Sequence, residues 1–350
     1  MISFHHPIVS EDLAQICSTR TDWTRFAGKT VMITGATGML ATYLTYFFLY
    51  LKKEQKIDLR LIILCRTERK AKALFGEQFD NGDMELLLQD ICDPLTLTDK
   101  VDYIFHLAGN ASPKYINTDP VGIITANIIG TRNVLELARK SGSKVFFAST
   151  REVYGANEGK LLLDEDSFGY INPMDNRSCY PESKRAAETL LRSYFNQYGV
   201  EVYVARIAHT YGPGMQIEND GRIMADLIGN AVRGEDIVLK SKGEALRAFC
   251  YLSDAISGIL TIMMSGEPGE AYNLSNETEE ISILQLAELM VKLSEGKSQL
   301  KFDIPPTNTG YCNYQRVALD SRKINVIGFR PQVPLKEGIR RTIQSFIASE

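Results

Sequence analysis

Hydrophobic and polar positions follow two alternating patterns along the first two hundred residues. Short apolar runs rich in Val, Ile, Leu and Phe recur, and longer segments with apolar residues at helical spacing separate them. Apolar runs of this length predict buried parallel strands, expected at 29–34, 59–64, 84–88, 101–107, 145–148 and 201–207. Strands that alternate with helices predict an α/β fold, a Rossmann-type doubly wound parallel sheet with right-handed crossovers.

The regular alternation of apolar strands and helices ends at about residue 207. Loops rich in Gly, Asn and Pro separate shorter helices, expected at 223–233 and 283–293. This change predicts a smaller C-terminal substrate-binding α/β domain. The expected division is an N-terminal extension over 1–28, a dinucleotide-binding domain over 29–206 with a return segment near 245–262, and a mainly substrate-binding part over 207–350.

Composition narrows the classes of function. The net charge of −4 gives no basic field for nucleic acid or an anionic membrane surface. Apolar runs such as 43–51 are too short to span a bilayer, and no secretory signal is visible. Six cysteines without metal spacing indicate reduced thiols, so a cytoplasmic protein without a metal site is expected. For His5 and His6, a packed or solvated extension is a better interpretation than a metal site.

A glycine-rich turn follows the first predicted strand and leads into a helix. It reads Thr34-Gly35-Ala36-Thr37-Gly38-Met39-Leu40-Ala41. Gly35 permits a tight turn, and Gly38 allows a pyrophosphate to approach the backbone at the positive end of the helix. The strand, turn and helix together predict a dinucleotide site that includes Gly35, Thr37, Gly38, Met39 and Leu40.

The ends of later strands extend this predicted site. Arg66 stands where NAD sites usually carry an acidic residue, and a guanidinium suits a 2′-phosphate, so NADP(H) is slightly favoured over NAD. The alternative is that Arg66 stacks on adenine or faces solvent and NAD binds. His106 is expected to pack rather than act as a base. The other predicted cofactor contacts are Asp90, Ile91, Leu107, Ala108, Gly109, Asn127, Tyr180 and Lys184.

Two segments carry candidate catalytic chemistry. Thr150 and Glu152 follow the strand predicted at 145–148, and Tyr180 and Lys184 lie four residues apart on a predicted helix. An adjacent ammonium should lower the pKa of the Tyr180 phenol, which would then exchange a proton with a sugar hydroxyl while hydride moves to or from a nicotinamide. A Tyr and a Lys at this spacing also occur on ordinary helix surfaces, but the nucleotide fingerprint favours the catalytic interpretation.

The motifs together resemble the extended short-chain dehydrogenase/reductases of the NAD-dependent epimerase/dehydratase family, which act on nucleotide sugars. The resemblance covers about residues 29–345 and rests on TGATGMLA, HLAGNAS, FASTREVYG, YPESKRAAE and VARIAHTYGPG. It implies that Thr150, Tyr180 and Lys184 are the catalytic hydroxyl, phenol and lysine, with Lys184 also binding the nicotinamide ribose. The branch that it resembles most is that of the UDP-glucuronate decarboxylases.

Three positions depart from the family pattern. Arg151-Glu152 stands where dehydratases carry Asp-Glu, which disfavours 4,6-dehydration, although Glu152 can still abstract a proton beside a 4-keto group. Decarboxylases usually carry Ser at Arg151, and His209 replaces an Asn that commonly touches the diphosphate. The third departure is Arg66. The predicted substrate-binding residues are Arg151, His209, Arg222, Arg247 and Arg316.

The leading hypothesis is C4 oxidation of a nucleotide sugar such as UDP-glucuronate, followed by decarboxylation or epimerisation and return of the hydride. One alternative is an NADPH-dependent net reductase of a nucleotide-linked keto sugar, forming for example a CDP-alditol or deoxysugar. Another is a non-catalytic dinucleotide-binding protein. The broad apolar faces of helices 120–140 and 180–198 predict a homodimer, with plain core packing as the alternative.

Overall fold

A seven-stranded, all-parallel sheet forms the centre of the computed structural model, which describes residues 2–157, 159–304 and 318–347. Its strand order is β12-β7-β5-β4-β1-β2-β3. The strands are β1 (Lys29–Thr34), β2 (Leu59–Cys65), β3 (Glu85–Leu88), β4 (Tyr103–His106), β5 (Lys144–Thr150), β7 (Val202–Ile207) and β12 (Ala271–Leu274). The predicted Rossmann-type fold is confirmed, with β12 as an edge strand that the sequence pattern did not reveal.

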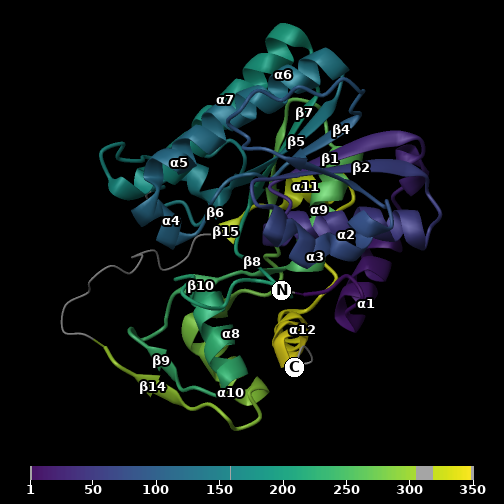
Figure 1. The fold of residues 1–350 in the computed structure, drawn as a ribbon. Coiled ribbons are helices and arrows are strands. Elements are labelled where there is room, and N and C mark those ends of the chain that lie inside the picture. The colour runs from purple at the N-terminus through teal and green to yellow at the C-terminus, as the bar shows by residue number, and fades with distance from the viewer. Residues whose placement is uncertain (1, 158, 305–317, 348–350) are drawn as a thin grey trace.

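Helices cover both faces of this sheet (Figure 1). One face carries α1 (Pro7–Cys17), α2 (Met39–Lys53), α3 (Glu68–Asp80) and α9 (Leu252–Ser265). The other carries α6 (Thr131–Ser141) and α7 (Cys179–Tyr198), and α5 (Pro120–Thr125) packs against α7. The helix expected over 120–140 is interrupted by a π-helical turn, Ala126–Gly130, between α5 and α6.

The order of the strands in the sheet indicates where a ligand binds. The chain runs outward from β1 through β2 to β3, then returns to the other side of β1 for β4 and β5. The order therefore reverses between β1 and β4, and ligands of open α/β sheets bind at such a reversal, beyond the carboxyl ends of the strands. The glycine turn after β1 and the loop after β4 meet there.

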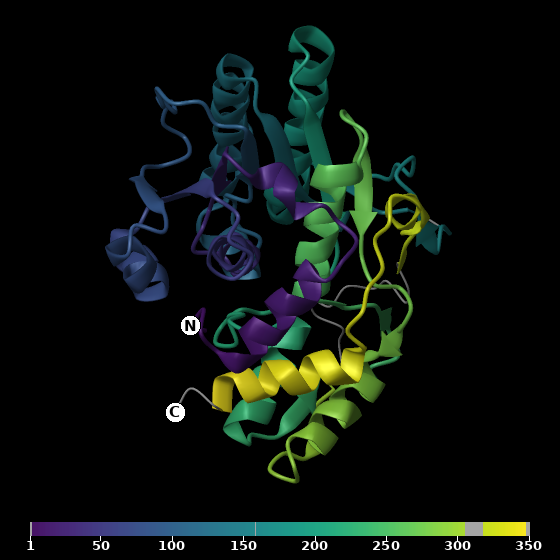
Figure 2. The same cartoon turned by 90° about the vertical axis from the view of Figure 1, so that its right-hand side faces the viewer.

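The N-terminal segment is part of the core. Val9, Leu13 and Ile16 of α1 are buried against the sheet-covering helices. The buried Asp12 carboxylate accepts hydrogen bonds from Tyr43 Oη at 2.5 Å and Tyr251 Oη at 2.9 Å, and from Arg341 Nη1 at 2.6 Å. This cluster joins α1 to α2, to β11 (Cys250–Tyr251) and to α12 (Leu335–Ile347), and Figure 2 shows α1 beside α12.

A second hydrophobic core lies below the sheet in Figure 1, between α8 (Ile223–Arg233), α10 (Ile283–Leu293) and α12. The bounds of α8 and α10 match the sequence prediction. Four two-stranded sheets complete this part: β8 (Thr210–Tyr211) with β11, β9 (Ile237–Leu239) with β14 (Leu300–Phe302), β10 (Leu246–Arg247) with β13 (Ile281–Ser282), and β6 (Leu162–Leu163) with β15 (Ala318–Leu319). The remaining helices are α4 (Pro113–Thr118), α11 (Arg322–Val326) and 3-10 turns at Trp23–Phe26, Arg151–Tyr154 and Asn176–Ser178. Throughout the described ranges, no helix has the length and apolar character to cross a bilayer.

Candidate active site

The glycine turn after β1 is shaped to let another backbone pass close to it. Gly35 has φ of 69°, and a Cβ at this position would lie 2.7 Å from Ala108 Cα and 2.8 Å from Ala108 N. Gly38 begins α2 without a side-chain cap, so the first amide groups of that helix are left for another acceptor. An uncapped helix N-terminus beside a tight glycine turn fits the pyrophosphate of a dinucleotide.

Arg66 and Asp90 lie together at the ends of β2 and β3. Arg66 Nη1 is 3.6 Å from Asp90 Oδ2, and the Arg66 side chain is 64% exposed. Asp90 also accepts a hydrogen bond from Cys92 N at 2.9 Å, and this bond is the main reason that the pKa of Asp90 lies below its usual value. Arg66 therefore stands beside a carboxylate, a neighbour that the sequence pattern did not suggest.

A second polar cluster lies where the loop after β4 approaches α7. A Cβ at Gly109 would come within 2.8 Å of Asn127 Oδ1 and 3.6 Å of Lys184 Nζ. Asn127 Nδ2 donates to Ser183 Oγ at 2.9 Å, whereas its buried Oδ1 atom has no hydrogen-bond partner in the described part of the chain. A free acceptor and an ammonium beside a glycine fit the polar end of a dinucleotide, so these residues suit the predicted cofactor.

Tyr180 is buried at the start of α7, beside Thr150. Burial, and then the charge of Glu152, raises the pKa of Tyr180 to about 12, while the Thr150 hydroxyl and the charges of Arg222 and Arg177 act in the opposite direction. The sequence argument expected Lys184 to lower this pKa, and for the ligand-free protein that expectation is wrong. Lys184 Nζ donates instead to Ala148 O at 2.7 Å, and burial lowers the pKa of Lys184 to about 7.

Glu152 is held at the edge of this cluster. Thr150 Oγ1 caps the turn by accepting from Glu152 N at 3.2 Å, which fixes the backbone of the 3-10 turn. Arg177 Nη2 lies 2.9 Å from Glu152 Oε1. Sequence reasoning missed Arg177, because a pairing across 25 residues has no local signal.

The charges of three arginines act on the buried His209. Burial, followed by the charges of Arg151, Arg247 and Arg222, holds the pKa of His209 well below its usual value, so the imidazole is neutral. Its buried Nε2 atom has no partner among the residues described. Arg222 also acts on Tyr180, so the two clusters are continuous. The structure thus brings four of the predicted substrate residues together, while Arg316 lies outside the described residues.

A buried ion pair stands behind these groups. Arg206 Nη2 lies 2.8 Å from Glu188 Oε2, and each side chain is 14% exposed. Ser149 Oγ also donates to Glu188, which lies one helical turn after Lys184. Glu188 raises the pKa of Lys184, opposing the effect of burial. Helical spacing from Lys184 was the signal that could have revealed Glu188.

Comparison with known proteins agrees with this geometry. The model of the NAD dependent epimerase/dehydratase family matches residues 31–275. The chain belongs to this family. It is 37% identical over 319 residues to UDP-glucuronic acid decarboxylase 1 of Danio rerio, covering 91% of this chain and 72% of the relative.

Solved structures of similar fold include UDP-glucose 4-epimerase of Thermotoga maritima with UDP-glucose, with a TM-score of 0.77, 24% identity, and coverage of 91% of this chain and 99% of that one. They also include dTDP-glucose 4,6-dehydratase of Bacillus anthracis in complex with NAD, with a TM-score of 0.74, 20% identity and coverage of 92% and 97%. At these identities the likeness supports the fold alone.

His106 packs in this epimerase/dehydratase family member, as the sequence predicted. Its Nδ1 atom lies 2.8 Å from Thr34 Oγ1, and its Nε2 atom lies 3.1 Å from Thr131 Oγ1. Burial, and secondarily the charge of Lys184, lowers the pKa of His106 to about 3. The neutral ring joins β1, β4 and α6 and has no contact with Tyr180 that would make it a base.

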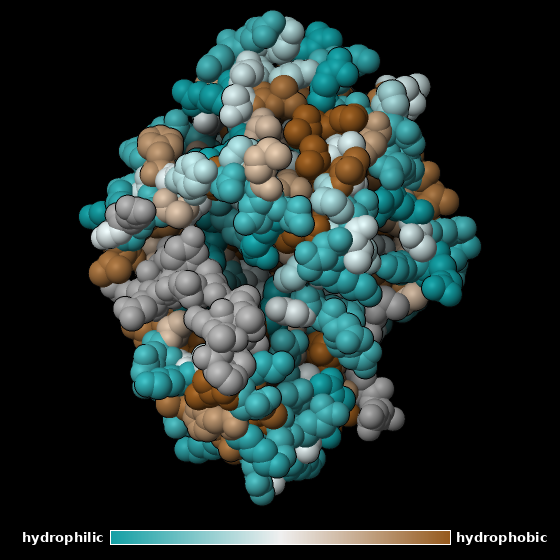
Figure 3. Space-filling view, turned by 90° about the vertical axis from the view of Figure 1, so that its left-hand side faces the viewer, coloured by the Kyte–Doolittle hydropathy of each residue, from teal (hydrophilic) through white to brown (hydrophobic). Residues whose placement is uncertain are grey.

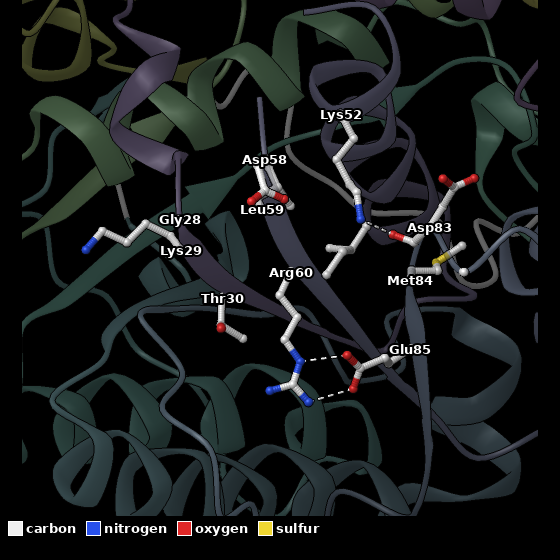
Figure 4. A pocket seen from close by; sticks show the side chains of 12 residues that line it. Gly28, Lys29, Thr30, Lys52, Asp58, Leu59, Arg60, Asp83, Met84 and Glu85 are labelled. Atoms are coloured by element: carbon white, nitrogen blue, oxygen red, sulfur yellow. Dashed lines mark hydrogen bonds and ion pairs between the residues drawn. The ribbon is translucent and has the colours of Figure 1, made fainter. Parts of the chain in front are cut away.

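A pocket of about 310 Å³ opens at the opposite end of the sheet, beside the amino ends of β1 and β2 (Figure 4). Arg60 in this pocket makes two hydrogen bonds to Glu85, and Lys52 donates to Asp83 O at 2.5 Å. Arg60 and Glu85 in this pocket are matched with each other, and the pocket lies away from the residues that the family motifs mark. The candidate active site is therefore the cluster at the carboxyl ends of the strands.

Proposed function

We propose that this protein binds NAD(P) and a UDP-linked uronate and acts through a 4-keto sugar, with decarboxylation or C4 epimerisation as the net reaction. The observation that carries the proposal is that the Thr150 hydroxyl bonds to Tyr180, while Lys184 on the same helix lies beside Gly109, next to the residue that packs against Gly35. The relatives named UDP-glucuronic acid decarboxylase support the substrate class.

The cofactor would lie between the two polar clusters. Gly35 and Gly38 would receive its pyrophosphate, and Asn127 and Lys184 would hold its nicotinamide end. The bound dinucleotide supplies a hydride acceptor and, when oxidised, a positive charge. Arg66 supports NADP(H), so Arg66→Glu should weaken NADP⁺ binding more than NAD⁺ binding. Equal weakening of both would leave that preference without a basis.

Tyr180 would take the proton of the C4 hydroxyl. A phenol with a pKa of about 12 is a poor base near neutral pH, so the reaction needs a positive charge close to the phenolate. Protonated Lys184 is one such charge, and Thr150 holds the same oxygen by a hydrogen bond. Glu152, which already acts electrostatically on Tyr180, would move a proton at the carbon beside the C4 carbonyl.

The arginine cluster would bind the anionic part of the substrate. His209, Arg222 and Arg247 lie in the segment 207–350, for which a mainly substrate-binding role is proposed. Arg222 is fixed by Asp220, since its Nη2 atom donates to Asp220 Oδ2 at 3.0 Å. Ser112 Oγ of the loop after β4 donates to Asp220 O at 3.4 Å, so the cofactor loop and the substrate segment are joined.

Incubation with UDP-glucuronate and NAD⁺ or NADP⁺ tests the proposal. We expect UDP-xylose or the C4 epimer as product, without net cofactor consumption; stoichiometric NADPH oxidation with a keto sugar would indicate a reductase instead. Tyr180→Phe should abolish turnover and keep cofactor binding, whereas Tyr170→Phe, at a residue 69% exposed, should keep both. The absence of turnover across UDP-, dTDP-, CDP- and GDP-sugars would refute the proposed function.

We also propose that two copies associate through the face formed by α5, α6 and α7. Val121 and Ile124 of α5, Ile129 of the π-helical turn and Tyr198 of α7 are exposed, and Figure 3 shows apolar side chains gathered over the upper part of this side. A contiguous apolar patch on a folded surface favours association. Light scattering should give twice the chain mass for the wild type and the monomer mass for Ile129→Glu; a wild-type monomer would contradict this.

A further inference from the structure

Arg151 keeps a guanidinium without a partner in the middle of the candidate site. It lies between Thr150 and Glu152, at the start of the 3-10 turn, and is half-buried. Within residues 2–157, 159–304 and 318–347, its guanidinium makes no hydrogen bond or ion pair, and its charge acts on His209. Partial burial of a charge is costly unless a partner compensates for it.

Neighbouring arginines are already matched with carboxylates. Arg177 is paired with Glu152 at 2.9 Å, and Arg222 is paired with Asp220 through two nitrogens. The charge of Arg151 has no such counterpart in the described part of the chain. An incoming anion would therefore find Arg151 available, whereas it would have to compete with Glu152 for Arg177.

His209 provides an independent sign of a missing ligand. Its Nε2 atom is sealed from solvent and lacks a hydrogen-bond partner among the described residues. Burial, and then the charges of nearby arginines, lower the pKa of the ring and keep it neutral. A buried polar atom left in this state destabilises the ligand-free protein. An anion with two oxygens could satisfy Arg151 by a paired hydrogen bond and reach towards His209.

We propose that Arg151 binds a carboxylate on the sugar and is the residue that distinguishes a nucleotide-linked uronate from a neutral hexose. The inference rests on the proposed function. Thr150 and Glu152, which flank Arg151, are proposed to act at C4 and at the carbon beside it. The C6 carboxylate is attached to that neighbouring carbon, C5, whereas the diphosphate is attached to C1 on the opposite side of the ring.

Recognition of this kind has a consequence for the loss of CO₂. In the 4-keto uronate the C5–C6 bond breaks, its electron pair moves into the C4 carbonyl as an enolate, and C6 leaves as CO₂. A proton taken up from solvent and passed on by the Glu152 carboxylate then adds to C5, which returns the enolate to the 4-keto sugar. Negative charge moves away from the carboxylate in this step, so a guanidinium on the carboxylate stabilises the bound substrate more than the transition state. Arg151 therefore strengthens binding of the uronate but does not speed the loss of CO₂.

Arg151→Ser separates these effects, because it introduces the residue that the decarboxylases usually carry. In the full-length protein loaded with NAD⁺, we expect the affinity for UDP-glucuronate to fall roughly 10- to 100-fold, the worth of a charged hydrogen bond. The affinity for UDP-glucose should stay within about twofold, and kcat for UDP-glucuronate should not fall. Arg151→Lys should restore part of the lost affinity. Arg192→Ser, at an exposed arginine of α7, is the matched control.

The outcomes separate the two proposals. Equal weakening of UDP-glucuronate, UDP-glucose and UDP would assign Arg151 to the diphosphate and overturn carboxylate recognition, while leaving the proposed function intact. Unchanged affinity for all three would also overturn it. Failure of the wild-type protein to bind any of the three would refute the proposed function itself, and this inference with it.

Discussion

Replacement of Lys184 by Met should stabilise the cofactor-free protein, and the effect should disappear at alkaline pH. Lys184 is buried between the sheet and α7, with only 5% of its surface exposed. Burial disfavours the charged form of its amine. Burial lowers its pKa from 10.5 to about 7. On folding, the Lys184 amine must either lose its proton or lose the water around its charge, and either change reduces the stability of the folded state.

The magnitude follows from that shift. At about 1.4 kcal/mol per pKa unit, the penalty near and below pH 7 is roughly 5 kcal/mol. Loss of the hydrogen bond from Lys184 Nζ to Ala148 O offsets about 1 kcal/mol or more. Because part of the remainder is lost to imperfect packing of the methionine, we expect Lys184→Met to raise the free energy of unfolding by about 3 kcal/mol at pH 7.

The free energy of unfolding of the wild type should rise with pH relative to that of the variant. Between pH 7 and 10.5 the unfolded chain binds a proton at residue 184 that the folded chain does not, so wild-type stability rises with pH relative to the variant. Urea unfolding of nucleotide-stripped protein at pH 7, 8, 9 and 10 measures this. The two proteins should converge as the pH approaches 10, while turnover of the variant is abolished.

Exposed Lys140 of α6 provides the control: Lys140→Met should change stability by less than about 0.5 kcal/mol at each pH. A stability difference between Lys184→Met and wild type that stays constant from pH 7 to 10 would refute the reasoning, as would a destabilised variant at pH 7.

Two further changes test the supporting structure. Glu188→Gln leaves the buried Arg206 guanidinium without its carboxylate and should lower the free energy of unfolding by about 3–5 kcal/mol in urea, whereas Arg139→Ala breaks an exposed pair and should cost under about 0.5 kcal/mol; similar losses would contradict the burial argument. Gly35→Ala should weaken dinucleotide binding by more than about tenfold in calorimetry, because its Cβ meets the Ala108 backbone. Gly142 has the same φ of 69° with open space around it, so Gly142→Ala should cost about 1 kcal/mol of stability and leave binding unchanged.

The sequence predicted those parts of the site that local patterns encode. The position of Gly35 after a strand, and the spacing of Tyr180 and Lys184 on a helix, both depend on a few neighbouring residues, and the structure has them as expected. The helices at 223–233 and 283–293 also follow from local periodicity. The edge strand β12 was missed because its four residues, Ala-Tyr-Asn-Leu, are too few to establish a period.

Contacts between distant segments were beyond the sequence argument. Arg177 with Glu152, Arg66 with Asp90, and Asp12 with Arg341 each join residues that only the fold brings together. The direction of the Tyr180 pKa was wrong for a related reason. Spacing alone shows which charges can lie near a phenol, but the extent of burial depends on packing over the whole site, and here burial outweighs the neighbouring charges.

Buried polar groups in this protein fall into two kinds, and the difference bears on function. Asp12 has three donors, and Glu188 is matched by Arg206 and Ser149, so these clusters stabilise the fold without any ligand. Asn127 Oδ1 and His209 Nε2 lack partners in the described residues. Each unsatisfied atom destabilises the ligand-free protein, and a ligand that supplies the missing partners recovers that free energy as affinity. Asn127 Oδ1 lies beside Gly109, and the charge of Arg151 acts on His209, so a dinucleotide and an anionic sugar bound together would account for both atoms.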